Sequence, residues 1–145
     1  MLPEARPEHT RARLLRLFPA ASDVTPPADV QRAIDAIVAL LRGETSDLSF
    51  VTLDMNGVPA FHRRVYEVAR TIPPGTTRSY GDIASRLGEP HAARAVGQAL
   101  GRNPFPIIVP CHRVLAANGR TGGFSAPGGT ATKLRLLAIE GERLI

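Results

Sequence analysis

The chain has 145 residues, a 43% hydrophobic fraction and a net charge of +5 that arginine carries almost entirely. This length allows one sizeable core, or one domain with a small companion. No apolar run approaches the ~18 residues of a membrane helix and no signal-peptide pattern opens the chain, so we expect a soluble, intracellular protein. The only cysteine, Cys111, excludes internal disulfides and a thiolate-rich zinc site.

The first part of the chain, residues 1 to about 28, is rich in proline, alanine and charged residues, with one short apolar stretch. Two prolines mark its end. Asp29 is then a plausible N-cap for a helix whose apolar residues recur at helical spacing as far as Leu41. Gly43 follows as the residue expected to close that helix.

A short strand is predicted over Leu48–Leu53, and Asn56-Gly57 has the composition of a turn. From Val58 onward the pattern becomes more regular. We therefore expect a small N-terminal domain over residues 1–57, with one main helix and a short strand, and a second domain over residues 58–145.

Three short helices are predicted in the first part of the second domain. Apolar residues recur at helical spacing over 61–69, and the loop Ile72-Pro-Pro-Gly75 cannot continue a helix. Ser79 is expected to cap a second helix, Tyr80–Leu87, and a third covers about His91–Leu100. Two short helices joined by a glycine-containing turn are typical of a helix-turn-helix, although the same pattern occurs in an ordinary helical hairpin.

The C-terminal part of the second domain begins with a rigid proline-rich connector after Asn103, which leads to an apolar, strand-like run ending at Cys111. A glycine-rich loop over 119–129 follows. Thr130 or Thr132 is expected to start a last helix that ends at Gly141. The side chains predicted to face inward from this helix are Leu134, Leu137 and Ala138.

Cys111 and His112 form the most reactive pair in the sequence. A thiol attacks as its thiolate, and the reference pKa near 8.5 leaves only a few per cent ionised at neutral pH, so a base or a cation is needed. His112 is the local candidate for that base, although neighbouring residues on a strand point to opposite faces. Alternatively, Cys111 is a small buried hydrophobe and His112 a satisfied core or surface residue.

Arginines dominate the charge of the helical region. Between Phe61 and Asn103, seven arginines stand against three acidic residues. Such a segment suits a phosphate backbone. An arginine-rich solvated surface would look the same in the sequence.

The Pro-Cys-His-Arg-Val segment around Cys111 resembles the active-site motif of the O6-alkylguanine-DNA alkyltransferases. Further motifs occur in the family's order between about Phe61 and Gly141: Arg-Thr-Ile-Pro-Pro-Gly, Ser-Tyr-Gly-Asp-Ile-Ala, Arg-Ala-Val-Gly, Gly-Arg-Asn-Pro and Leu-Leu-Ala-Ile-Glu-Gly. The resemblance implies an α+β fold: a mostly helical C-terminal domain with a helix-turn-helix and a short active-site strand or loop, preceded by a shortened N-terminal domain.

The resemblance also implies roles in catalysis. Cys111 matches the alkyl acceptor, His112 the water-mediated base and Glu140 the carboxylate that orients it. Tyr80 matches the tyrosine that rotates the target nucleotide out of the duplex and gives a proton to the leaving guanine. Neither a metal nor a cofactor is implied.

For DNA, the resemblance implies a recognition helix that lies in the minor groove. Arg94 matches the arginine that enters the duplex, and small residues around it allow a close approach with little sequence readout. The residues expected to bind DNA are Tyr80, Ala93, Arg94, Ala95, Gly97 and Arg102.

The family's substrate pocket also finds matches in this sequence. Asn103 matches the asparagine that braces the turn before the active site, the carbonyls of Cys111 and Val114 match the acceptors of the guanine amine, and the Ser125 amide matches the donor to O6. Phe124 replaces a tyrosine found in many members. The loop over 125–129 is about two residues longer than in members with a shorter glycine loop. The residues expected to line the pocket are Asn103, Val114, Phe124, Ser125 and Lys133.

These matches predict a monomeric, single-turnover DNA repair protein. It would move the alkyl group of O6-alkylguanine, or of O4-alkylthymine, from double-stranded DNA to Cys111. Its expected location is the cytoplasm, on the nucleoid when bound to DNA, with no membrane partner. Two alternatives stay open: a lesion-sensing or regulatory module without efficient transfer, and a Cys-His hydrolase.

Overall fold

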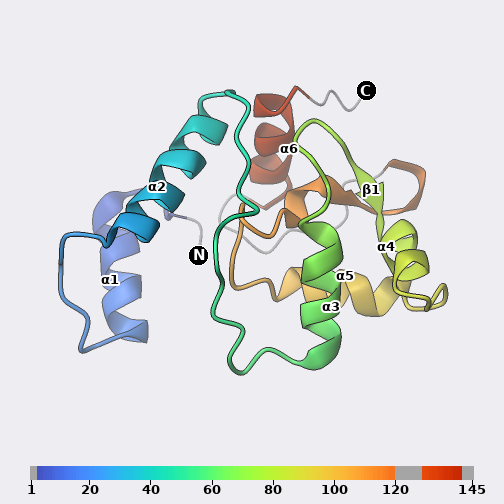
Figure 1. Cartoon of the computed structure of the whole chain (residues 1–145), viewed down its shortest axis with the longest axis horizontal. Helices are drawn as coiled ribbons and strands as arrows, with labels where there is room; N and C mark the ends of the chain where they lie inside the picture. The colour runs from blue at the N-terminus through green and yellow to red at the C-terminus, as the bar shows by residue number, and fades with distance from the viewer. Residues whose placement is uncertain (1–2, 120–128, 142–145) are drawn as a thin grey trace.

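The computed structural model describes residues 3–119 and 129–141 and is mostly helical (Figure 1). Its α-helices are α1 (Pro7–Leu17), α2 (Ala28–Leu41), α3 (Ala60–Ala69), α4 (Tyr80–Arg86), α5 (Ala93–Gly101) and α6 (Gly129–Ile139). Two short strands, β1 (Arg78–Ser79) and β2 (Val114–Leu115), and two 3₁₀ turns, η1 (Cys111–Arg113) and η2 (Ala117–Gly119), complete it. The expected α+β class is confirmed.

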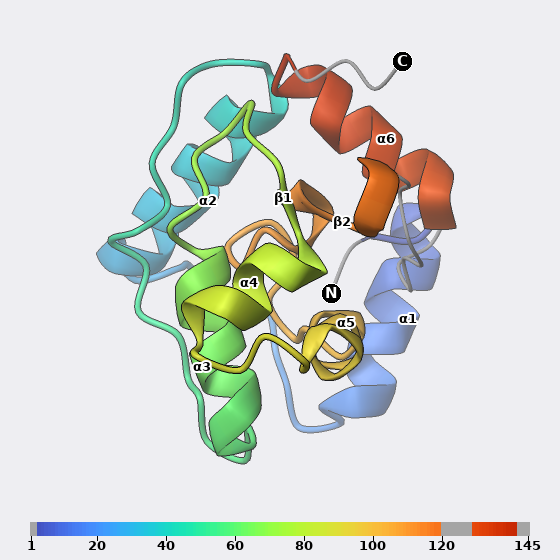
Figure 2. The same ribbon diagram turned by 90° about the vertical axis from the view of Figure 1, so that its right-hand side faces the viewer.

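The helix-turn-helix is formed by α4 and α5, which lie beside α3 (Figure 2). Ser79 caps α4 as predicted: its side chain accepts from the Asp82 amide, and the Asp82 carboxylate accepts from the Ser79 amide. Gly88 takes a positive φ of 75° in the turn, which suits glycine. Behind the pair, the Tyr66 hydroxyl donates to the Ala99 carbonyl across 2.7 Å and so fixes α5 against α3.

The two strands pair in parallel, with Arg78 opposite Val114 and Ser79 opposite Leu115. This pairing joins the residue before α4 to the residues after η1. The expectation that a strand leads up to Cys111 is wrong, because Cys111 begins the 3₁₀ turn and the strand starts at Val114. Between α5 and Cys111, a segment that the structure describes in full, the only strand-like pairing is the isolated bridge between Pro106 and Val109.

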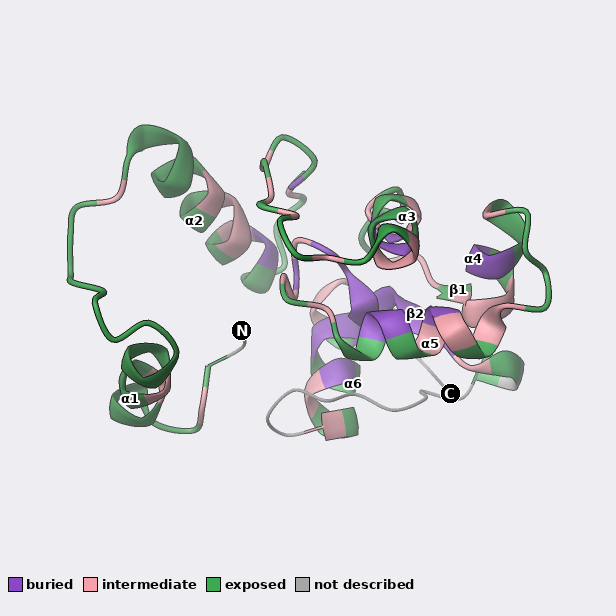
Figure 3. Ribbon diagram, turned by 90° about the horizontal axis from the view of Figure 1, so that it is seen from below, coloured by how far each residue is buried: buried purple, intermediate pink, exposed green. Residues whose placement is uncertain are grey.

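The N-terminal part of the chain is loosely packed (Figure 3). Helix α1, which the sequence did not predict, buries none of its residues, and α2 buries only Leu40. Asp29 does not cap α2, since Pro27 holds the N-cap position and the Asp29 carboxylate accepts only from the Val30 amide next to it. Gly43, with a φ of 83°, follows the end of α2 as expected.

The predicted strand over Leu48–Leu53 is absent from the structure. The Arg70 guanidinium takes the place of a partner strand, because its Nη2 donates to the carbonyls of Leu48 at 3.1 Å and Val51 at 2.8 Å. These backbone groups are therefore satisfied by a side chain from the end of α3. The turn at Asn56-Gly57 is present as predicted.

The inward face expected for helix α6 is confirmed at Leu137 and wrong at Leu134 and Ala138. The helix buries Lys133, Leu136 and Leu137, whereas Leu134 is 39% exposed and Ala138 is exposed. Gly141 follows its end with a φ of 88°, as predicted. No helix within residues 3–119 and 129–141 has both the length and the apolar composition needed to cross a bilayer.

Candidate active site and DNA-binding helix

Cys111 is buried at the first position of η1, with 8% of its surface exposed. Burial raises the pKa of its thiol, while a hydrogen bond from the Asn103 side chain and the nearby charge of Lys133 act in the opposite direction. The resting sulfur is therefore held mainly as the thiol, and a nearby base is needed to form the nucleophile.

His112 follows in the same turn, is 1% exposed, and lies beside Glu140 at the end of α6. Its Nε2 is 2.8 Å from Glu140 Oε1. Burial would raise the pKa of Glu140, but hydrogen bonds from His112 and Arg113 and their charges outweigh it and lower the pKa to about 2. An ionised carboxylate only accepts, so Nε2 carries the ring proton in neutral His112.

The other ring nitrogen of His112 is then the basic one. Nδ1 is buried and has no hydrogen-bond partner in the described part of the chain. Burial lowers the pKa of His112 against the opposing effect of Glu140, which favours the neutral ring. A buried acceptor without a partner can accept a proton, either from the thiol of Cys111 or from a water between the two side chains.

Asn103 holds the connector that leads to Cys111. Its Nδ2 donates to the Val109 carbonyl and its Oδ1 accepts from the Phe105 amide, each across 2.8 Å. Between these two anchors Ile107 adopts a φ of 75°, a costly conformation for a β-branched residue. The two hydrogen bonds stabilise this turn, which places η1.

Tyr80 and Lys133 also lie close enough to Cys111 to interact with its charge. Burial, and then the charge of Cys111, raises the pKa of the Tyr80 hydroxyl. Lys133 is 1% exposed and donates to the Val114 carbonyl across 2.6 Å, with its Nζ 6.0 Å from the centre of the Tyr80 ring. Burial lowers the pKa of Lys133 to about 8. A tyrosine that keeps its proton and a lysine thus lie near the thiol.

The expected DNA-binding residues lie on or next to α5. Arg94 and Arg102 are exposed, near the beginning of α5 and just beyond its end, while Ala93 and Ala95 are half-buried. A side chain at Gly97 would meet the ring of Tyr80 at 3.9 Å, so the ring of Tyr80 lies against this helix.

The structure thus brings together the expected residues Tyr80, Asn103, Cys111, His112, Val114, Lys133 and Glu140. Phe124 and Ser125 lie outside the described residues. Arg113 was not among the residues expected in the site, but its side chain makes two hydrogen bonds to Glu140. A charged residue inside an otherwise apolar run was the available signal.

The fold and the residues around Cys111 define a helix-turn-helix domain with a buried thiol beside a histidine–carboxylate pair. A family model described as the DNA-binding domain of 6-O-methylguanine DNA methyltransferase matches residues 60–142. The chain belongs to this family.

Relatives support the same assignment. The methylated-DNA–protein-cysteine methyltransferase of Mycobacterium bovis is 45% identical over 86% of this chain and 74% of its own length. The protein of that name from Methanothermobacter thermautotrophicus is 39% identical over 86% of this chain and 68% of its own. The crystal structure of Mycobacterium tuberculosis OGT in complex with DNA matches with a TM-score of 0.69 and 47% identity, over 76% of this chain and 66% of that chain.

Proposed function

We propose that this protein repairs alkylated DNA directly, by moving the alkyl group from O6 of guanine to the sulfur of Cys111. Membership of the methyltransferase family is the observation that carries the proposal. The buried thiol beside the His112–Glu140 pair supports it, because that pair supplies the base which a thiol of raised pKa requires.

The reaction is an in-line displacement. The thiol proton of Cys111 passes to Nδ1 of His112, directly or through a water, while Nε2 stays bonded to Glu140. The sulfur–carbon bond forms as the carbon–O6 bond breaks, and the electron pair of that bond stays on guanine. A proton then reaches the guanine anion, for which Tyr80 is the proposed donor. The proton held on His112 then passes through solvent to the Tyr80 oxygen, so the net balance is one thiol and one alkylguanine giving one thioether and one guanine.

The positions of Tyr80 and Lys133 suit a leaving group that develops negative charge. The raised pKa of Tyr80 keeps its proton available at neutral pH, and the Lys133 cation lies near the Tyr80 ring. Val114 already accepts a hydrogen bond from Lys133, and its carbonyl has a second lone pair for the guanine amine. The thioether is chemically stable, so each molecule acts once.

Double-stranded DNA is the proposed partner. The target base must leave the stack to meet a buried sulfur, at a cost of a few kcal/mol. Arg94, exposed near the start of α5, is proposed to occupy the vacated space, and Arg102 to contact phosphate. We also propose a monomer that works in the cytoplasm on chromosomal DNA, with a division of the chain near residue 57.

Intact mass measurement tests the transfer. The protein is incubated with a duplex that contains O6-methylguanine, and we expect a stoichiometric gain of one methyl group on Cys111. Cys111→Ala should abolish this gain and leave affinity for DNA within a small factor, because the side chain is buried. A methyl group found on another residue, or repeated turnover, would contradict the proposal.

Base extrusion is tested with Arg94→Ala. We expect repair of the duplex to slow by roughly 10- to 100-fold, which corresponds to a few kcal/mol of extrusion cost. Reaction with free O6-benzylguanine should stay within about twofold, since a free base needs no extrusion. Equal loss on both substrates would show that Arg94 supports the fold instead.

A further inference from the structure

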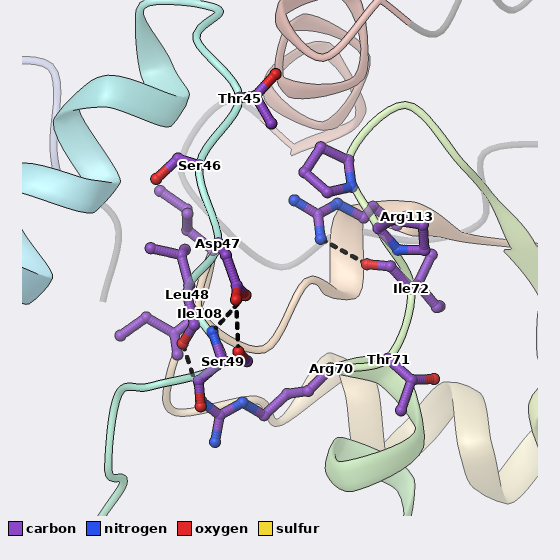
Figure 4. Close-up of a pocket in the computed structure, with 13 residues that line it drawn as sticks. Thr45, Ser46, Asp47, Leu48, Ser49, Arg70, Thr71, Ile72, Ile108 and Arg113 are labelled. Atoms are coloured by element: carbon purple, nitrogen blue, oxygen red, sulfur yellow. Dashed lines mark hydrogen bonds between the residues drawn. The ribbon is translucent and has the colours of Figure 1, made fainter.

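Arg113 joins three segments of the chain at the active site. Its Nε donates to Glu140 Oε2 at 2.9 Å, its Nη2 to Glu140 Oε1 at 2.7 Å, and its Nη1 to the Ile72 carbonyl at 2.7 Å. Figure 4 shows the bond to Ile72. Arg113 lies in η1, Glu140 follows α6, and Ile72 lies in the loop that leads to β1. The Arg113 side chain, which is 6% exposed, therefore holds both carboxylate oxygens of Glu140.

The carboxylate is shared. Glu140 Oε1 accepts from both His112 and Arg113, while Oε2 accepts from Arg113 alone. The bidentate pairing holds the plane of the carboxylate, so Oε1 stays directed at Nε2 of His112. A lysine offers only a point charge and cannot reproduce this geometry.

The protonation of His112 depends on its burial and on the charged groups around it. Burial disfavours protonation of His112 most strongly, Glu140 favours it, and the charges of Arg113 and Lys133 disfavour it. The other ionisable groups near these side chains are the thiol of Cys111, the hydroxyl of Tyr80 and the carboxylate of Asp47, which lines the same pocket as Arg113. The loop 72–77, which packs on Arg113, carries no ionisable side chain. Arg113 is thus the cation bound directly to the carboxylate that orients His112.

We propose that Arg113 is a positioning residue for alkyl transfer: it orients Glu140 and neutralises its charge, so that His112 remains an unprotonated base. The inference rests on the proposed function for its catalytic meaning and on the hydrogen bonds of Arg113 for its geometry. It separates two effects of Glu140. The carboxylate fixes the ring tautomer, and Arg113 prevents the same carboxylate from holding a second proton on the ring.

Arg113 lies beside a pocket, so that shorter side chains can be tested at this position. A pocket of about 260 Å³ lies between segment 45–49, the loop 70–74 and Arg113. Figure 4 shows segment 45–49 facing Ile72 and Arg113 across it. A shorter side chain at position 113 therefore opens towards an existing pocket and does not leave a sealed void, whose cost would grow with its volume.

The experiment compares Arg113→Met, which removes the charge, with Arg113→Lys, which keeps the charge without the bidentate contact. Protonation of His112 is followed by NMR of labelled histidine, with His112→Gln identifying its signal among the four histidines. The rate of benzyl transfer from free O6-benzylguanine is measured across pH on the same proteins. Arg64→Met is the matched control, because Arg64 pairs with Glu89 on the exposed side of the helical domain.

We expect Arg113→Met to raise the pKa of His112 by about one unit, the scale of a neighbouring charge. A base works only when unprotonated, so the acid limb of the rate profile should move to higher pH by the same amount. At pH values below the pKa of His112, the rate of Arg113→Met should be about tenfold lower than that of the wild-type protein, and it should recover at higher pH. Arg113→Lys should shift the limb less, and Arg64→Met should leave it in place.

A uniform loss of rate at every pH, with the His112 titration unmoved, would overturn the proposal and leave Arg113 a purely structural residue. If Arg113→Met does not fold, the smaller shift in Arg113→Lys decides the question. In the Glu140→Gln background, removal of Arg113 should raise the pKa of His112 less than it does in the wild-type protein, because only the direct effect of the Arg113 charge is then lost. If the wild-type protein accepts no alkyl group, the proposed function fails, while the NMR titration still tests the role of Arg113.

Discussion

The two halves of the chain are held together in different ways. Helices α3, α4 and α5 bury large apolar side chains against one another, among them Val65, Ile83 and Val96, each at most 1% exposed. Helix α1 buries nothing and α2 buries Leu40 alone (Figure 3). The proposed active site lies entirely in the well-packed half, so the N-terminal half is expected to influence stability more than chemistry.

Several contacts join the halves, among them a small apolar cluster and the side chain of Arg70. Leu40 and Leu48 pack with Ile107, and Arg70 donates to backbone carbonyls of the segment after α2. Several apolar side chains of α2 remain partly exposed, including Ile34 at 40% and Val38 at 38%. Such positions contribute little burial to the free energy of folding.

A matched pair of isoleucines gives the largest test of this comparison. Ile83→Ala should lower the free energy of unfolding by about 2–5 kcal/mol, because the side chain is 1% exposed and its loss leaves a cavity. Ile34→Ala should cost less than about 1 kcal/mol, because the position is already partly solvated. Both are measured by denaturant unfolding. Equal losses would mean that α2 is as tightly packed as α4.

A pair of carboxylates tests the comparison through pH. Glu140 in the folded protein keeps its charge down to a pKa of about 2, against 4.5 for the free group, so the unfolded chain takes up the proton first. The stability that Glu140 contributes is therefore complete above about pH 4.5 and is lost as pH falls towards 2. Glu140→Gln should flatten this loss in unfolding experiments across that range.

The control is Asp47, whose pKa is also lowered, first by the Ser49 amide and then by the Ser49 hydroxyl. Its carboxylate is exposed, and solvent screens such interactions. Asp47→Asn should change the acid dependence much less than Glu140→Gln. A larger effect at Asp47 would place the acid-sensitive contact in the N-terminal half.

The smallest expected effect concerns DNA. Arg102 is exposed next to the end of α5 and Arg16 is exposed in α1. Arg102→Gln should reduce the slope of log affinity against log salt by about 0.9, the value for one lost phosphate contact. Arg16→Gln should leave the slope unchanged. Affinities of an undamaged duplex at several salt concentrations measure both, and an equal change would extend the DNA-binding surface to α1.

Local signals in the sequence predicted the helix-turn-helix well. Ser79 and Asp82 are three residues apart, so the cap on α4 depends on nearby residues alone. The glycines at the end of α2, in the turn at Gly57 and after α6 act equally locally. These elements needed no knowledge of what packs against them.

Other elements depended on partners far along the chain. The strand predicted over Leu48–Leu53 is missing because Arg70, about 20 residues away, bonds its carbonyls. Lys133 faces inward because the Val114 carbonyl accepts a hydrogen bond from its Nζ, and no periodicity predicts that contact. The pairing of Arg113 with Glu140 spans 27 residues, so only the fold brings the two together.

The two-residue pairing of β1 with β2 has a consequence for how the length of this chain can vary. Tyr80 directly follows Ser79, and η1 directly precedes Val114, so no spare residue separates the paired strands from Tyr80 or from the turn that carries Cys111. One residue inserted at either junction would rotate a reacting side chain away from its partners. An insertion between Gly88 and Ala92 would instead change the turn between α4 and α5 and leave both junctions intact. Natural and engineered variation in length should therefore concentrate in that turn and be absent from both junctions.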